Sequence, residues 1–374
     1  MSCSMGLVFF SLTFMYTIKS PLRSGIYHAF TNKTIFQAIS PELKLQNTSK
    51  KNEQSLQHPK RVNIILMSFP RSGSSFLGAI FHQHPGVFYL FEPLGPLQNS
   101  LTKAAGFEFE HSSPSHQKKA FEFFRHDELQ VSVDSGLFIR HLVPKVRKRT
   151  LALNSPPFCV KNGKSTVCHK LTPQQLETVC NNNYSVFAAK IFTPRISISH
   201  NDWNKNVLQS CSSNGASECK IIHLVRDPRA VVESLKSLNF FRQPNEPKRE
   251  LSWYVERIYH QKEFDLKIGK LIRTFLPDGY NLIRFEAVAL NPLPVVSDLY
   301  NFTGIEMLDT IKKWLQEATT SRNGRRGGPY STSRDSKKVV SNWRTRMSSS
   351  NVQIVENYCR RLMRQLNYTL NSTP

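Results

Sequence analysis

Residues 62–77 read VNIILMSFPRSGSSFL, and this stretch decides the fold. Its first part, residues 62–68, is an almost continuous apolar run, which is typical of a strand covered on both faces of a parallel sheet. A small-residue loop follows at once, and Phe76, Leu77, Ile80 and Phe81 then have helical spacing. We therefore predict a strand that enters a loop and a loop that opens a helix.

The loop has the chemistry of an anion site. Its residues are Pro70, Arg71, Ser72, Gly73, Ser74 and Ser75. Backbone N–H groups and the positive end of the helix dipole point at a ligand bound there, Gly73 permits close approach, and Arg71 adds a planar guanidinium. The hydroxyls of Ser74 and Ser75 can donate to the anion or cap the helix. The alternative is a serine-rich capped turn with a surface arginine.

The loop is not a Walker A motif, because the pattern GxxxxGK[ST] is absent. An ATP- or GTP-dependent enzyme would also need a carboxylate that holds Mg²⁺ after another strand, and no convincing one follows. The sequence therefore disfavours a phosphoryl-transferring kinase.

Three more apolar runs, at residues 186–191, 221–225 and 281–285, predict further buried strands, with segments of helical spacing between them. This alternation predicts an α/β fold with a central parallel sheet flanked by helices, in one domain over residues 61–370. Residues 102–182 interrupt the order and are interpreted as an irregular insertion stapled by cysteines.

A second motif follows the run 221–225, where residues 226–234 read RDPRAVVES. Pro228 suits the first turn of a helix, so we expect Arg226 at the carboxyl end of a strand and Ser234 two turns into the helix. A guanidinium and a hydroxyl brought together in this way can hold a terminal phosphate. The alternative is a structural ion pair between Asp227 and Arg229.

The two motifs resemble the nucleotide-binding elements of the Golgi carbohydrate 6-O-sulfotransferases, which act on galactose, N-acetylgalactosamine or N-acetylglucosamine. Further similarity lies in FYLFEPL at 88–94, in LIRFE at 282–286 with NP at 291–292, and in YST at 330–332 through WR at 343–344. The 88–94 block is closest to the keratan-sulfate galactose and chondroitin branch. The resemblance covers most of residues 61–368, and departures after residue 94 and in the middle segment leave the acceptor sugar open.

The resemblance implies a P-loop-like sulfotransferase domain that transfers a sulfuryl group from 3′-phosphoadenylyl sulfate (PAPS) to a sugar 6-hydroxyl and releases PAP. It implies that residues 70–76 bind the 5′-phosphosulfate, that Arg226 and Ser234 bind the 3′-phosphate, and that no metal is needed. The acceptor would be a glycan or proteoglycan of the keratan or chondroitin sulfate type. A catalytically silent relative that binds PAP and glycans is the alternative.

Such a transfer needs charge stabilisation on the sulfuryl oxygens and a base for the hydroxyl proton, and we assign these roles to Arg71 and Glu92. Glu92 follows the first helix, so the chain can bring its carboxylate back to the active-site cleft. Three histidines are rivals. We expect His82 and His84 to end the helix facing solvent, and His223 to be buried within a strand.

The composition and the N-terminus indicate the compartment. The chain has 50 Lys+Arg against 27 Asp+Glu, a formal net charge of +23, which suits an anionic partner. Residues 1–18 are apolar and uncharged and predict an uncleaved signal-anchor, with a cleaved signal peptide as the alternative; residues 19–60 predict a stem. With the resemblance, this implies a single-pass type II protein of the Golgi membrane with a lumenal catalytic domain. A homodimer is left open, and no nucleic acid partner is expected.

Sequons and cysteines agree with a lumenal address. The sequons are at Asn32, Asn47, Asn183, Asn301, Asn367 and Asn371. The cysteines after the leader permit three disulfides, and they are Cys159, Cys168, Cys180, Cys211, Cys219 and Cys359.

Two basic clusters are candidates to steer an anionic glycan, with a solvated charged loop as the alternative. They are Lys145, Arg147, Lys148 and Arg149 in the insertion, and Arg322, Arg325 and Arg326 further on.

Overall fold

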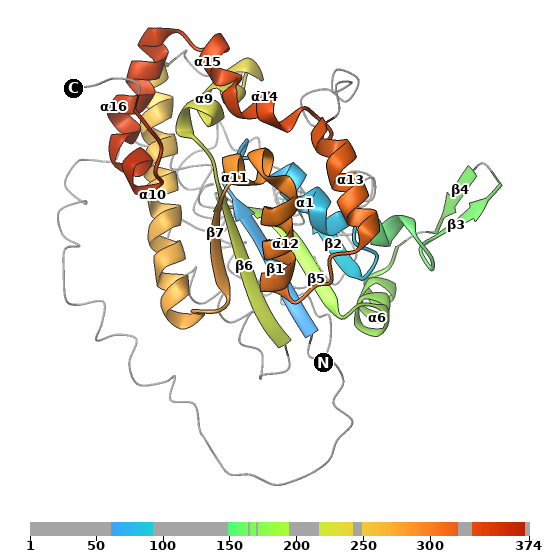
Figure 1. Ribbon diagram of the computed structural model, residues 1–374. Helices are drawn as coiled ribbons and strands as arrows, with labels where there is room; N and C mark the ends of the chain where they lie inside the picture. Colours follow the sequence, from blue (N-terminus) through green and yellow to red (C-terminus); the bar gives the residue numbers. More distant parts are fainter. Residues whose placement is uncertain are drawn as a thin grey trace, which may run out of the picture.

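Within the part of the chain that the structure describes, the centre is a sheet of five parallel strands in the order β2-β5-β1-β6-β7 (Figure 1). The computed structural model describes residues 61–92, 149–193 without 164 and 170, 217–241, 249–320 and 331–370. The strands of this sheet are β1 Arg61–Ser68, β2 Val87–Phe91, β5 Val186–Phe192, β6 Ser217–Val225 and β7 Tyr280–Arg284. The predicted α/β class with a central parallel sheet is confirmed.

The anchor and stem predicted for residues 1–60 lie outside the described residues. Lys145, Arg147 and Lys148 of the first basic cluster and the whole second cluster also lie outside them. Among the helices that are described, none combines the length and the apolar character needed to cross a bilayer.

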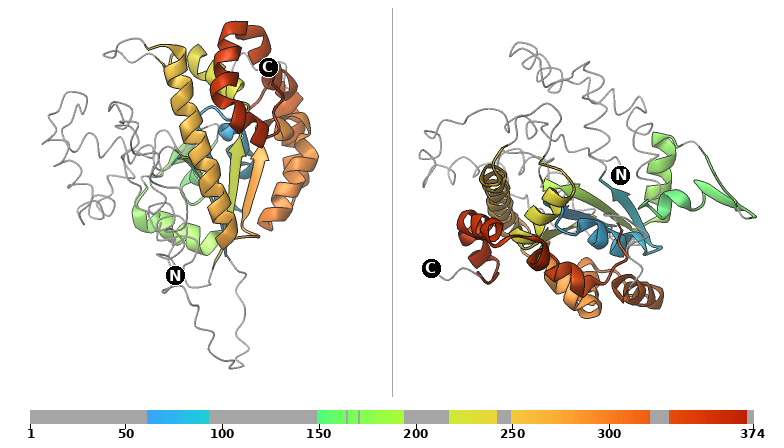
Figure 2. Two further views of the ribbon diagram at one scale, coloured as in Figure 1. Left: turned by 90° about the vertical axis from the view of Figure 1, so that its left-hand side faces the viewer. Right: turned by 90° about the horizontal axis from the view of Figure 1, so that it is seen from above.

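Helices cover both faces of the sheet (Figure 2). On one face, Ile268 and Ile272 of the long helix α10 (Leu251–Phe275) pack with the strand residues Met67 and Ile221. On the opposite face lie α1, α11 and α12, whose apolar side chains share a core with even-numbered residues of β1 and β6. The helices other than α10 in this region are α1 Ser74–His82, α9 Pro228–Ser237, α11 Phe285–Leu290, α12 Pro292–Thr303, α13 Asp309–Thr320, α14 Ser336–Ser341, α15 Trp343–Arg346 and α16 Ser349–Gln365.

One glycine on each face lets a helix lie close to the sheet. Gly78 of α1 lies against the hydroxyl of Tyr89 on β2, and Gly269 of α10 lies against the hydroxyl of Tyr280 on β7. A Cβ at either glycine would overlap that oxygen. Both tyrosines are buried, so the two helices and the two outermost strands are held together by a ring that leaves no room for a larger residue.

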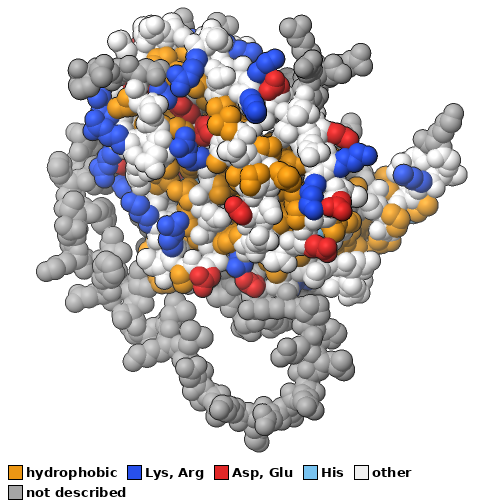
Figure 3. All heavy atoms as spheres, in the orientation of Figure 1, with side chains coloured by type: hydrophobic (Ala, Val, Ile, Leu, Met, Phe, Trp, Pro, Cys, Tyr) orange, Lys and Arg blue, Asp and Glu red, His pale blue; other side chains and the backbone are white. Residues whose placement is uncertain are grey.

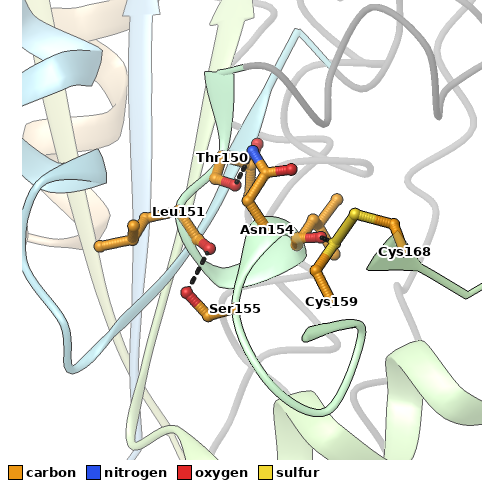
Figure 4. The surroundings of a disulfide bond; sticks show 7 residues. Thr150, Leu151, Asn154, Ser155, Cys159 and Cys168 are labelled. Atoms are coloured by element: carbon orange, nitrogen blue, oxygen red, sulfur yellow. Dashed lines mark hydrogen bonds between the residues drawn. A yellow bond between two sulfur atoms is a disulfide. The ribbon is translucent and has the colours of Figure 1, made fainter. Parts of the chain in front are cut away.

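The described part of the predicted insertion is built around a disulfide. Strands β3 (Cys159–Asn162) and β4 (Ser165–Cys168) form an antiparallel hairpin, and the bond between Cys159 and Cys168 joins its two ends. Figure 4 shows this bond beside the short helix η4 (Ala152–Asn154). In Figure 1 the hairpin projects from the side of the domain that carries β2.

The helix α6 (Pro173–Asn183) follows the hairpin and begins with a capping box between Thr172 and Gln175. Cys180 and Cys219 are also disulfide-bonded, whereas Cys359 of α16 is free and fully buried. Cys359 therefore takes no part in the disulfide pairing that the sequence permits. Cys359 faces the apolar core, and burial raises the pKa of its thiol to about 12.

A buried ion network fixes the start of α9 against the C-terminal helices. Arg229 is only 1% exposed; its Nη2 donates to Asp227 Oδ2 over 2.8 Å and its Nη1 to Glu356 Oε1 over 2.6 Å. The guanidinium also lies 4.2 Å from the ring centroid of the buried Trp343. The predicted structural pair of Asp227 and Arg229 is thus present, and it ties α9 to α15 and α16.

We expect Arg229→Met to lower the free energy of unfolding by about 3–5 kcal/mol, because it leaves two buried carboxylates without their cation. Guanidinium chloride denaturation followed by fluorescence measures the loss. Lys236→Met, in the exposed last turn of the same helix, is the control and should change the value by no more than about 0.5 kcal/mol. An Arg229→Met protein as stable as the wild type would contradict this role.

Candidate functional site

The first motif forms the turn between β1 and α1. Arg71 and Gly73 both have positive φ, 65° and 92°. A Cβ at Gly73 would also overlap the ring of Phe285, so conformation and space both favour glycine here. Gly73 O accepts from Phe76 N and Leu77 N, which leaves the earlier N–H groups of the first turn for a ligand.

The serine side chains of this loop do not cap the helix, because Gly73 occupies the N-cap position and no side chain bonds there. Ser72 is fully buried, and its Oγ has no hydrogen-bond partner within the described residues. The same is true of Ser68 Oγ at the end of β1. Because buried hydroxyls are almost always paired, these two are donors that a bound ligand can satisfy.

The second motif follows β6 as predicted. Asp227 is the N-cap residue of α9, and its side chain accepts from Arg229 N over 2.9 Å. Pro228 is the first residue of the helix, so Ser234 lies nearly two turns along it. Arg226 is buried between β6 and the helix, and burial lowers the pKa of its guanidinium.

The two motifs touch each other. Arg71 Nε donates to Ser234 Oγ over 3.0 Å, and Arg226 Nη1 donates to Arg71 O over 3.0 Å. Arg226 Nη2 donates to Val339 O over 3.2 Å, and its Nε is buried with no partner within the described residues. β1 and β6 are neighbours in the sheet. The turns that follow them are more than 150 residues apart in sequence, and they contact each other at the carboxyl ends of the strands.

The carboxylate of Glu286 holds the backbone of the second motif in place. Glu286, at the start of α11, accepts from Asp227 N over 3.0 Å and from Tyr368 Oη over 2.7 Å. Glu286 and Tyr368 are both buried. The segment 282–286, which sequence comparison singled out without a role, therefore holds the backbone beside Arg226 in place.

Glu92 lies at the end of β2, with a positive φ of 47°. Its carboxylate accepts from Lys190 Nζ over 2.5 Å, and its side chain is 18% exposed. β5 lies between β2 and β1 in the sheet, so the carboxyl ends of four neighbouring strands bring Glu92 and both motifs to one edge of the sheet.

Lys190 was missed by the sequence reasoning. It is fully buried, and its Nζ lies 4.3 Å from the ring centroid of Phe91 and 4.2 Å from that of Phe192. A lysine inside the apolar run VFAAKIF was a signal that could have found it, because a buried cation needs a partner. That partner is Glu92.

The three rival histidines have structural partners. His223 is 1% exposed and shares a 2.8 Å hydrogen bond with Tyr280 Oη, and burial lowers its pKa to about 3. His82 Nδ1 accepts from Leu151 N over 2.7 Å, and His84 Nδ1 accepts from Gly86 N over 3.1 Å. His82 and His84 are half-buried rather than solvent-facing, so that expectation is wrong.

Some of the Lys and Arg side chains in the described residues lie away from the two motifs. Figure 3 shows Lys and Arg side chains along the side of the molecule formed by α10 and α16. Lys270 and Arg273 are exposed near the end of α10, just before β7 begins, and so lie toward the amino ends of the strands. Within the described residues no group of three or more His, Cys, Asp or Glu side chains is arranged to hold a metal ion.

Comparisons with known proteins identify the family to which the chain belongs. The family model described as "Sulfotransferase domain" matches residues 61–367. Carbohydrate sulfotransferase 1 of Mus musculus is 26% identical over 352 residues, which cover 83% of this chain and 80% of the relative. Carbohydrate sulfotransferase 6 of Homo sapiens is 26% identical over 334 residues, which cover 82% and 81%.

Among solved structures, the sulfotransferase domain of the Synechococcus PCC 7002 olefin synthase aligns with a TM-score of 0.43 and 16% identity, over 83% of this chain and 98% of that domain. The resemblance inferred from the motifs is confirmed by the carbohydrate sulfotransferase relatives. Because the family model spans most of the described residues, the chain belongs to the sulfotransferase family and is a transferase enzyme.

Proposed function

We propose that the protein transfers a sulfuryl group from PAPS to the 6-hydroxyl of a Gal, GalNAc or GlcNAc residue in a glycan or proteoglycan, with keratan or chondroitin sulfate type chains favoured. The observation that carries the proposal is the direct contact between the two motifs, Arg71 Nε to Ser234 Oγ and Arg226 Nη1 to Arg71 O. PAPS carries a phosphate on the 3′-oxygen and a phosphosulfate on the 5′-oxygen of one ribose, so it needs two anion sites that lie close together. The names of the relatives support a carbohydrate acceptor.

The residues present fit such a donor. The turn 70–76 offers N–H groups and Arg71 to the 5′-phosphosulfate, while Arg226 and Ser234 offer a guanidinium and a hydroxyl to the 3′-phosphate. Ser72 Oγ and Arg226 Nε are buried polar atoms without partners in the described chain, and donor oxygens would satisfy both. PAPS carries the activated sulfuryl group, and PAP is the product that leaves.

On the acceptor side, Glu92 accepts the proton of the sugar hydroxyl as its oxygen forms a bond to sulfur. The bond between sulfur and the PAP oxygen breaks in the same displacement, and Arg71 stabilises the charge on the sulfuryl and leaving oxygens. The ammonium of Lys190 lies 2.5 Å from the Glu92 carboxylate and holds it in place just after β2.

A Golgi lumenal address is part of the proposal, with the protein as a single-pass type II membrane protein. The disulfide between Cys159 and Cys168 suits an oxidising compartment. The sequon residues Asn183, Asn301 and Asn367 have exposed side chains in the folded domain, as glycan attachment requires.

We expect Arg71→Ala and Arg226→Ala each to raise the KM for PAPS roughly 10- to 100-fold, because each removes charged hydrogen bonds to the donor. Retention on immobilised PAP and transfer of [³⁵S]sulfate from PAPS to keratan- and chondroitin-type acceptors, without added metal, measure the effect. Lys236→Ala is the control. Unchanged PAP retention in both variants would overturn the donor site, and PAP retention with no transfer to any acceptor would favour a catalytically silent relative.

We expect Glu92→Gln to retain PAP binding while turnover falls roughly 100- to 10,000-fold, the range in which a positioned base contributes. The same [³⁵S] transfer assay measures turnover. Glu306→Gln changes an exposed glutamate and should leave the rate unchanged. Intact turnover in Glu92→Gln would remove this residue as the base while leaving the donor site standing.

A further inference from the structure

A lysine with no role so far occupies a core-facing position of α10. The buried side chains of this helix include Val255, Ile258 and Leu266, and Lys262 lies among them at helical spacing. Lys262 is only 5% exposed. A charge buried to this extent costs free energy unless a partner compensates it, so the position calls for an anion.

The carboxylates near Lys262 are bonded to other groups. The charges of Asp265 and Glu286 act on Lys262, but neither forms an ion pair with it. Asp265 accepts from Thr193 Oγ1 over 2.6 Å and from Gln261 Nε2 over 2.7 Å. Both oxygens of Glu286 accept from the second motif and the C-terminal segment. Within the described residues the ammonium of Lys262 therefore has no hydrogen-bond or ion-pair partner.

The ammonium lies beside the turns that carry the two motifs. It is 5.1 Å from the ring centroid of Phe69, whose carbonyl accepts from Ser72 N inside the first turn. Phe69 packs in the same apolar cluster as Val225, the residue before Arg226. The charge of Arg226 also acts on Lys262 and lowers its pKa. Lys262 is thus a third cationic residue at the place where the two turns contact each other.

The nucleotide-free protein holds these cations at a cost that an anion would remove. Arg226 is buried with its Nε unbonded within the described residues, and Lys262 adds a like charge nearby. Like charges close together disfavour one another. A phosphate dianion would compensate both, through charge-assisted hydrogen bonds that are stronger than those between neutral groups.

Resting on the proposed function, we propose that Lys262 is a further binding residue for the nucleotide donor, whose ammonium contacts the 3′-phosphate together with Arg226 and Ser234. The 3′-phosphate is favoured over the 5′-phosphosulfate because the charge of Arg226, not that of Arg71, is the cationic one that acts on Lys262. Lys262 takes no part in the bond changes at sulfur.

The first test compares two nucleotides by calorimetry: PAP, and adenosine 5′-monophosphate, which lacks the 3′-phosphate. We expect Lys262→Met to raise the Kd for PAP roughly 10- to 100-fold, as loss of a charged hydrogen bond predicts. The Kd for the 5′-monophosphate should change less than about twofold. The midpoint of thermal unfolding without nucleotide should not fall, because an apolar side chain replaces a buried charge that has no partner.

Lys270→Met is the matched control, since Lys270 is an exposed lysine of the same helix. It should leave the Kd of both nucleotides unchanged. An unchanged PAP Kd in Lys262→Met overturns the proposal, and so do equal losses for the two nucleotides. A nucleotide-free Lys262→Met protein that unfolds at a clearly lower temperature would also overturn it, because Lys262 would then stabilise the fold itself.

The pH dependence of PAP binding gives a second readout, which a structural role would not change. Burial lowers the pKa of Lys262 to about 8, whereas the second pKa of a phosphate monoester is about 6. The affinity of the wild type should therefore be full near pH 7 and fall as the pH rises to about 9.5, because the ammonium loses its proton. Lys262→Arg stays charged and should show no such fall. A constant wild-type affinity over this range overturns the proposal.

The other groups whose charges act on Lys262, or feel its charge, do not produce this fall. They are Arg226, Asp265, Glu286, Cys359 and His223. Burial raises the pKa of Asp265 to about 7 and that of Cys359 to about 12, and it lowers the pKa of His223 to about 3. Lys262→Arg retains all five groups, so a fall confined to the wild type belongs to Lys262.

Failure of the proposed function would look different. A wild-type protein that binds no PAP would sink the donor site as a whole, and this inference with it. A wild type that binds PAP as tightly as Lys262→Met does would remove Lys262 alone. Because both tests measure binding of PAP, they also decide the role of Lys262 in a catalytically silent relative.

Discussion

The contact of Arg71 with Ser234 and Arg226 is the interaction on which the rest of the site depends. It joins the turn after β1 to the helix after β6, and it exists because these strands are neighbours in a parallel sheet. Both loops leave the sheet at the same edge, so their guanidinium, hydroxyl and N–H groups converge. The family match over residues 61–367 establishes that the chain is a sulfotransferase, and this convergence is the geometry on which the proposed donor site rests.

Buried charges hold that edge in shape. Glu286 accepts from the backbone beside Arg226, and Arg229 ties the same turn to Glu356 of α16. A buried charge without a partner destabilises the fold strongly, whereas a buried pair adds little net stability. These groups therefore favour the one arrangement in which every charge is paired. Lys190 on β5 and Glu92 after β2 form another such ion pair, on the other side of β1 from β6. The candidate base and the two motifs are therefore held by separate networks.

Local patterns predicted much of this, and contacts between distant segments account for the rest. The apolar runs after residues 61, 185, 220 and 280 are strands within a few residues of the expected bounds, because burial on two faces leaves an unbroken apolar stretch. β2 was not predicted, although its residues VFYLF favour strands. The block that contains them was interpreted only for the role of Glu92. Lys190 and Glu286 could not be assigned roles, because their partners lie 98 and 59 residues away. Cysteine count could not show that Cys359 is buried and unpaired.

The bond from Tyr368 to Glu286 has a consequence for how the domain is made. Tyr368 follows Glu286 by 82 residues, and Glu356 follows Arg229 by 127. The turn of the first motif therefore leaves the ribosome long before Glu356 and Tyr368 do. During synthesis the proposed donor site stays incomplete until the groups that hold Asp227 and Arg229 have been made. Its completion awaits the C-terminal segment of the domain.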